Sequence, residues 1–108
     1  MDVKVLPSAE KDLDCGFVFY EQREIGVGNY FLKTLRADMR VLSFSAGIHS
    51  KRGKLFRMKS KKFPHWIYYG VIDSVVYVSA VLEARRSPSF IHRSEKQAQF
   101  FIKTIKGA

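Results

Sequence analysis

Residues 54 to 86 read KLFRMKSKKFPHWIYYGVIDSVVYVSAVLEARR, and this stretch decides the fold. Its pattern predicts three strands joined by two tight turns, at residues 61–62 and 73–74. In the first strand basic and apolar side chains alternate, so one face can pack and the other can bind anions. The second strand, residues 66–71, is apolar or aromatic at nearly every position, as is typical of a central strand buried on both faces.

Alternation along the third predicted strand, residues 75–82, separates two faces. One face should carry four apolar residues: Val76, Val78, Ala80 and Leu82. The same count, continued past the end of the strand, puts Arg85 on the side of Arg57 and Lys59. We therefore expect these three cations to share the basic face.

Helices should flank the three strands. A short strand at residues 3–6 leads into two amphipathic helices, about residues 8–24 and 29–44, which a glycine-rich turn separates. After the strands, residues 94–105 predict a C-terminal helix. Its apolar residues lie roughly on one side: Ala98, Phe101, Ile102 and Ile105.

The predicted order β-α-α-β-β-β-α indicates an α+β fold. A helical hairpin should pack against one face of a small, mainly antiparallel sheet, and the opposite, basic face should be left open. With 108 residues and 46% apolar content, the chain can build one core but not two. We expect a single domain over residues 1–108, with its core at 1–88 and a C-terminal helical extension at 89–108.

Charge and cysteine content restrict the class of protein. The net charge is +9, and residues 51–62 hold seven Lys or Arg and no acid, which favours an acidic or polyanionic partner. The single cysteine, Cys15, excludes an internal disulfide framework, fits a reducing compartment, and should be a buried, inert thiol. No apolar run approaches the roughly 18 residues of a membrane span, so we expect a cytoplasmic protein.

Catalytic chemistry is less well defined by the sequence. The three histidines, His49, His65 and His92, lack metal-ligand spacing, and we expect neither a metal nor a cofactor. His49 and His65 could each act as a general base near the cations, but His65 shares strand parity with Ile67 and could belong to the core. Aromatic residues that could stack on exposed bases, or equally pack in the core, are Trp66, Tyr68 and Tyr77.

Short motifs along residues 1 to 90 carry a resemblance to a known family. They are Leu6-Pro-Ser-Ala9, Asp12-Leu13, Phe19-Tyr20-Glu21, Gly26-x-Gly28, Gly47-Ile48-His49, Phe63-Pro64-x-x-Ile67-Tyr68-Tyr69, Ala80-Val81-Leu82 and Arg85-Arg86-x-Pro88. Together they resemble the RelE/ParE superfamily, the small toxins of bacterial type II toxin-antitoxin systems. The resemblance implies a cytosolic toxin and a cognate antitoxin whose tail covers the active face.

The superfamily has two branches, and the resemblance implies a different target in each. RelE-like toxins cut messenger RNA in the ribosomal A site, whereas ParE-like toxins inhibit DNA gyrase. The nuclease branch carries basic residues where this chain has Arg57 and Lys59, but it commonly has arginine, arginine and tyrosine near Trp66, Ala84 and Phe90. These departures slightly favour the ParE-like mode. If the chain is a ribonuclease, the catalytic set would be Arg57, Lys59, Glu83 and Arg86.

Either target would be bound through the basic surface. The residues expected there are Lys54, Arg57, Lys59, Lys61, Lys62, His65, Arg85 and Arg86. A third possibility, outside the family, is a small nucleic-acid-binding module that uses the same strand. A neighbouring gene for a small acidic protein would separate the two toxin hypotheses from this one.

Overall fold

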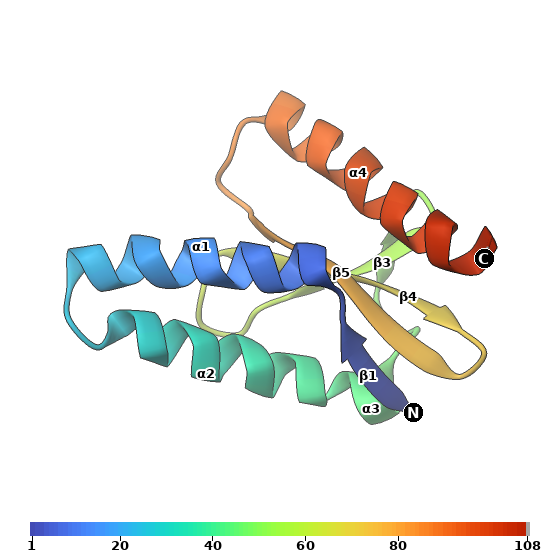
Figure 1. Cartoon of the computed structure of the whole chain (residues 1–108), viewed down its shortest axis with the longest axis horizontal. Coiled ribbons are helices and arrows are strands. Elements are labelled where there is room, and N and C mark those ends of the chain that lie inside the picture. Colours follow the sequence, from blue (N-terminus) through green and yellow to red (C-terminus); the bar gives the residue numbers. More distant parts are fainter. Residues whose placement is uncertain (108) are drawn as a thin grey trace.

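Five strands form one sheet in the order β1-β5-β4-β3-β2 (Figure 1). The computed structural model describes residues 1–107, apart from the side chains of residues 88, 90, 101, 104, 106 and 107. The strands are β1 (Asp2–Val5), β2 (Ser50–Arg52), β3 (Leu55–Lys59), β4 (His65–Ile72) and β5 (Val75–Glu83). β1 pairs with β5 in parallel, and every other neighbouring pair is antiparallel.

The sheet follows from local sequence. Asp73 and Ser74 both have positive φ, +49° and +63°, which is the geometry of a two-residue hairpin turn that matches the twist of β4 and β5. The predicted three-strand meander is therefore confirmed. The edge strand β2 lies in the stretch that the sequence pattern leaves as a loop.

Four helices accompany the sheet: α1 (Pro7–Arg23), α2 (Val27–Arg40), the short α3 (Leu42–Ser45) and α4 (Pro88–Gly107). Pro7 starts α1, where its missing N–H costs nothing. Gly26, with φ of +94°, makes the reversal between α1 and α2, because few other residues adopt that conformation. The predicted order β-α-α-β-β-β-α is confirmed.

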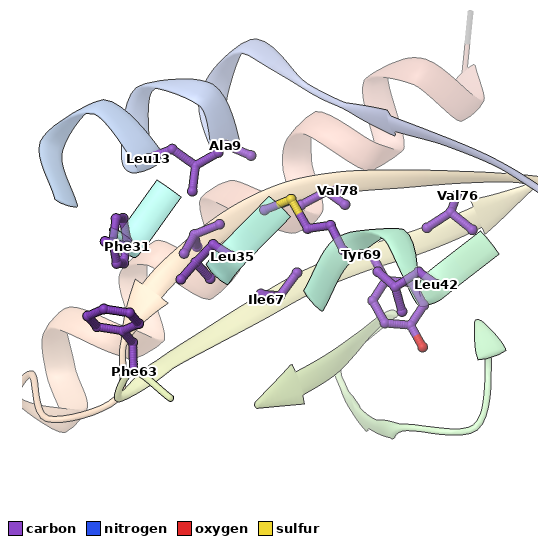
Figure 2. Close-up of a cluster of buried hydrophobic side chains, with 12 residues drawn as sticks. Ala9, Leu13, Phe31, Leu35, Leu42, Phe63, Ile67, Tyr69, Val76 and Val78 are labelled. Carbon is purple, nitrogen blue, oxygen red and sulfur yellow. The ribbon is translucent and has the colours of Figure 1, made fainter. Parts of the chain in front are cut away.

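The α1–α2 hairpin packs on one face of the sheet (Figure 2). Leu13 and Phe31 from the helices pack against Ile67 and Tyr69 of β4, and all four side chains are fully buried. At the N-terminal end of α1 two side chains bond to the edge of β5 beyond the end of β1. Ser8 Oγ donates to the carbonyl of Ser79 (2.7 Å), and Asp12 accepts from the backbone N–H of Val81 (2.9 Å).

The opposite face of the sheet is covered by α4, so the prediction of an open basic face is wrong. Figure 1 shows α4 crossing the sheet well apart from the α1–α2 hairpin. Ala98 and Ile102 of α4 are buried against a second cluster from the strands: Leu55, Tyr68, Ala80 and Leu82. Because both faces carry apolar side chains, both need a helical cover. The predicted contribution of Phe101 lies outside the described side chains.

A β-bulge at Ser79 changes which way the end of β5 faces. Tyr68 pairs with Ala80 and Tyr69 with Val78, so Ser79 is an extra residue in β5. Val78 packs with the hairpin cluster, whereas Ala80 packs with α4. The predicted run of four apolar residues on one face is therefore wrong beyond Ser79.

Candidate functional site

The basic side chain of Arg57 lies on the α4 face of the sheet. It is opposite Tyr68 in the pairing of β3 with β4, and its guanidinium lies 3.8 Å from the centroid of the Trp66 ring. The Lys59 ammonium lies 5.1 Å from the same ring. Cation–π contacts of this kind stabilise cations that are partly withdrawn from water, and only 16% of the Arg57 side chain is exposed.

A carboxylate from α4 enters this basic cluster. The Tyr68 hydroxyl donates a 2.5 Å hydrogen bond to Glu95, and the same Glu95 oxygen lies 3.7 Å from both Arg57 Nη1 and Arg52 Nε. Burial, and then the hydrogen bond to Glu95, raises the pKa of Tyr68 to about 12. Tyr68 is therefore a neutral hydrogen-bond donor at physiological pH and not a base.

A second polar cluster lies on the hairpin side, at the ends of β4 and β5. His65 pairs with Glu83 across the two strands, and Glu83 lies 3.5 Å from Arg85 and 3.5 Å from Arg86. The His65 ring contacts the rings of α1 and α2, including that of Phe31. Burial lowers the pKa of His65 to about 4, so the imidazole is neutral at pH 7.

A cavity of about 240 Å³ opens beside this second cluster. Its lining includes Asp12, Cys15, His65, Glu83 and Arg86. Cys15 is exposed, so the prediction of a buried thiol is wrong. The reason is that Cys15 lies on α1 beside this opening, on a side of the helix that the sheet does not cover.

The structure separates the residues that the sequence groups together. Arg57 and Lys59 lie on the α4 face of β3. Lys54 lies in the turn that leads into β3, and its backbone N–H donates to Gln99 of α4 (3.4 Å). Glu83, His65, Arg85 and Arg86 form the cluster at the ends of β4 and β5. Arg85 therefore lies with Glu83 and not beside Arg57, and the prediction is wrong. The reason is that the bulge at Ser79 moves every later residue of the strand to the other face of the sheet.

The remaining predicted binding residues lie at the turn between β3 and β4. Lys61 and Lys62 are exposed there, and the Lys62 ammonium lies 5.5 Å from the Tyr30 ring of α2. Tyr68 is fully buried and cannot stack on a base in this arrangement, and Arg57 covers a face of Trp66. His49 lies in the loop before β2, where its ring contacts the Tyr69 hydroxyl at 2.5 Å.

Two acidic residues take part in contacts that the sequence did not predict. Glu95 is the only acid in residues 84–108, and this isolated charge in an otherwise basic segment is the signal that could have identified it. Burial raises the pKa of Asp12 to about 6. The sequence pattern of α1 does not indicate that Asp12 accepts a hydrogen bond from the backbone N–H of Val81 in β5.

The described residues contain no group of three or more His, Cys, Asp or Glu side chains that could hold a metal ion. Within the same part of the chain, no helix has the length and apolar character that crossing a membrane requires.

The fold is RelE/ParE-like, as the similarity to solved structures shows. The chain resembles a chain of the chromosomal ParDE toxin-antitoxin system from P. aeruginosa, with a TM-score of 0.73 and 14% identity over 79% of this chain and 97% of that one. It also resembles a chain of the intact E. coli RelBE toxin-antitoxin complex, with a TM-score of 0.56 and 22% identity over 79% and 98% of the two chains.

A third similar structure is the isolated E. coli RelE toxin, with a TM-score of 0.54 and 19% identity over 88% of this chain and 96% of that one. No protein-family model matches the chain, and no curated protein matches it in sequence. At these identities the similarity concerns the fold.

Proposed function

We propose that this chain is the toxin of a type II toxin-antitoxin system and that a cognate antitoxin neutralises it. The RelE/ParE-like fold, the toxin-antitoxin systems to which its structural neighbours belong, and the motifs of the sequence support this assignment. The net charge of +9 supports an acidic partner. We further propose that the chain acts in the cytoplasm, where the targets of such toxins are found.

As its target we favour DNA gyrase, inhibited by binding, over messenger RNA. Cleavage of RNA through the 2′-hydroxyl needs a base, an acid and a cation that reach the same phosphate. Arg57 and Glu83 lie on opposite faces of the sheet, and this single observation carries the preference. His65, with a pKa of about 4, is a weak base at pH 7.

Ribosome-dependent cleavage of messenger RNA is the second candidate. Arg57 and Lys59 line one aromatic surface around Trp66, which is an arrangement suited to holding a phosphate. A nuclease of this kind would need to draw its acid and base from groups other than the Arg57–Glu83 pair. A nucleic-acid-binding module without toxicity is the third reading and predicts no antitoxin.

The test is induced expression of the chain alone in a bacterium, with pulse labelling of DNA and protein synthesis. The proposal predicts that DNA synthesis stops first, with intact messages and filamented cells. If protein synthesis stops first and messages are cut at codon boundaries, the chain is a nuclease and the gyrase assignment is wrong.

Variants refine this test. Arg57→Ala should weaken a broad protein interface only in part, whereas it should abolish a nuclease whose phosphate it holds. Lys33→Ala is the matched control, since Lys33 is an exposed cation on α2, away from the Arg57 cluster. Both variants should be compared at equal soluble levels, so that loss of toxicity is not confused with loss of folding.

A further inference from the structure

We infer that Arg52, Arg57 and Tyr68 form a binding site for a phosphate group and that Glu95 occupies this site as an internal competitor. The inference rests on the proposed function for its biological meaning, because it concerns the access of a target or an antitoxin to the Arg57 cluster. The contacts themselves require no target or antitoxin.

The site is defined by convergence on one atom. A single carboxylate oxygen of Glu95 accepts from the Tyr68 hydroxyl at 2.5 Å and lies 3.7 Å from guanidinium nitrogens of Arg52 and Arg57. The Glu95 side chain is only 13% exposed. The Arg52 side chain is 55% exposed, so the cluster opens to solvent on that side. A carboxylate that faces two guanidiniums and accepts from a phenol has the partners with which proteins bind anionic ligands.

Glu95 satisfies this site only in part. Two cations face one carboxylate, and both separations of 3.7 Å are too long for direct hydrogen bonds. Arg57 Nε is buried and has no hydrogen-bond partner among the described residues. A phosphate offers more oxygens and more charge than a carboxylate, so it can accept from the guanidinium fork and from Tyr68 together.

Glu95 is brought to the cluster by α4, which is held on the sheet by apolar packing and a hydrogen bond. On the described part of the helix, the buried side chains are Ala98 and Ile102, which pack on the α4 face of the sheet. Gln99 adds a 3.4 Å hydrogen bond from the backbone N–H of Lys54. A phosphate that enters the site must displace the Glu95 carboxylate, so α4 limits access to Arg57 in this state.

The test uses the fluorescence of Trp66, which is the only tryptophan and lies under the Arg57 guanidinium. Purified full-length protein is titrated with inorganic phosphate and, separately, with a short single-stranded RNA oligonucleotide at fixed ionic strength. The variants are Glu95→Gln and Arg57→Gln. Glu24→Gln is the matched control, because it removes an equal charge from an exposed glutamate of the α1–α2 hairpin.

Glu95→Gln should bind phosphate roughly tenfold more tightly than the unmodified chain, since it removes the competing charge and keeps a side chain of equal size. Glu24→Gln should leave the affinity unchanged, and Arg57→Gln should abolish binding. RNA binding that free phosphate competes away would assign the site to a phosphodiester; phosphate binding without RNA binding would assign it to a free phosphate or monoester.

Equal affinities for Glu95→Gln and Glu24→Gln would overturn the inference, as would phosphate binding that survives Arg57→Gln. Thermal unfolding of each variant, measured in parallel, shows whether a lost signal reflects misfolding. These titrations are independent of growth arrest. A toxic chain with no Glu95 effect refutes only this inference, and a clear Glu95 effect in a harmless chain refutes only the toxin assignment.

Discussion

Arg57 and Glu83 lie on opposite faces of one sheet, on the strands β3 and β5 that flank β4 in the same meander. Arg57 meets Tyr68 and Glu95 under α4, whereas Glu83 faces His65 beside the α1–α2 hairpin. The β-bulge at Ser79 causes this separation, because an extra residue in β5 reverses the direction of every side chain after it. In this structure the two charged side chains therefore belong to different surfaces of the sheet.

The first prediction is that Arg57 and Glu83 affect antitoxin binding independently of each other. Arg57→Ala should weaken binding of an acidic antitoxin, whereas Glu83→Ala removes a negative charge and should not weaken it. The two effects on binding free energy should add to within about 0.5 kcal/mol in the double variant, because the side chains share no partner. Isothermal titration calorimetry with the four proteins measures the coupling. A coupling energy well above that value would mean that the two residues act together.

The second prediction concerns Asp12 and pH. Burial raises the pKa of Asp12 in the folded chain to about 6 from an ordinary value of 3.8. The folded state therefore holds this proton more tightly than the unfolded state. The resulting stability is fully present below pH 3.8 and is lost as the pH rises through about 6.

Asp12→Asn should remove that dependence and still accept from the Val81 N–H. The unmodified chain should lose about 1–2 kcal/mol of unfolding free energy between pH 4.5 and pH 7 relative to the variant, a figure reduced for partial solvent screening. Urea unfolding of both proteins at the two pH values measures this difference. Parallel pH profiles for the two proteins would show that Asp12 is not the cause.

The third prediction concerns the close contact between α1 and α2. A Cβ atom added to Gly28 would lie 2.8 Å from the backbone oxygen of Phe17, and Gly28 is buried. Gly28→Ala should therefore destabilise the chain by about 1–3 kcal/mol, since the helices must move apart. Asn29→Ala, an exposed neighbour, is the control for chemical denaturation. Equal midpoints for the two variants would contradict the packing.

The fourth prediction concerns salt. The exposed cations of residues 51–62 should face the acidic antitoxin, so the affinity of the complex should fall as ionic strength rises. Titrations from low to physiological and then high salt measure this slope. An affinity indifferent to salt would indicate that apolar contacts, and not the basic residues, hold the antitoxin.

The sequence predicts the strands and helices of this fold because each has a period that local chemistry sets. Phe56 and Met58 alternate with Arg57 and Lys59, and the structure places both apolar residues against the hairpin cluster. The bulge at Ser79 was not predictable in this way. The residues around it are apolar on both faces of β5, so a shift of one residue leaves the hydrophobic pattern unchanged.

The local sequence pattern also could not predict where α4 packs. Ala98 and Ile102 indicate one apolar side of a helix but not the surface on which it packs. As a result the sequence predicted Arg57 and Lys59 as members of this cluster but neither Arg52 nor Glu95, which enters it from α4. Sequence periodicity places charges on a face, whereas the partner of each charge depends on contacts between distant segments.

The central claim is that an antitoxin binds and neutralises this chain, and co-expression tests it most directly. The chain is expressed alone and together with the small acidic protein that a neighbouring gene should encode, while growth and co-purification are measured. The account predicts growth arrest by the chain alone, and rescue by a partner that co-purifies with it in a salt-sensitive complex. A chain that neither arrests growth nor binds such a partner would contradict the account.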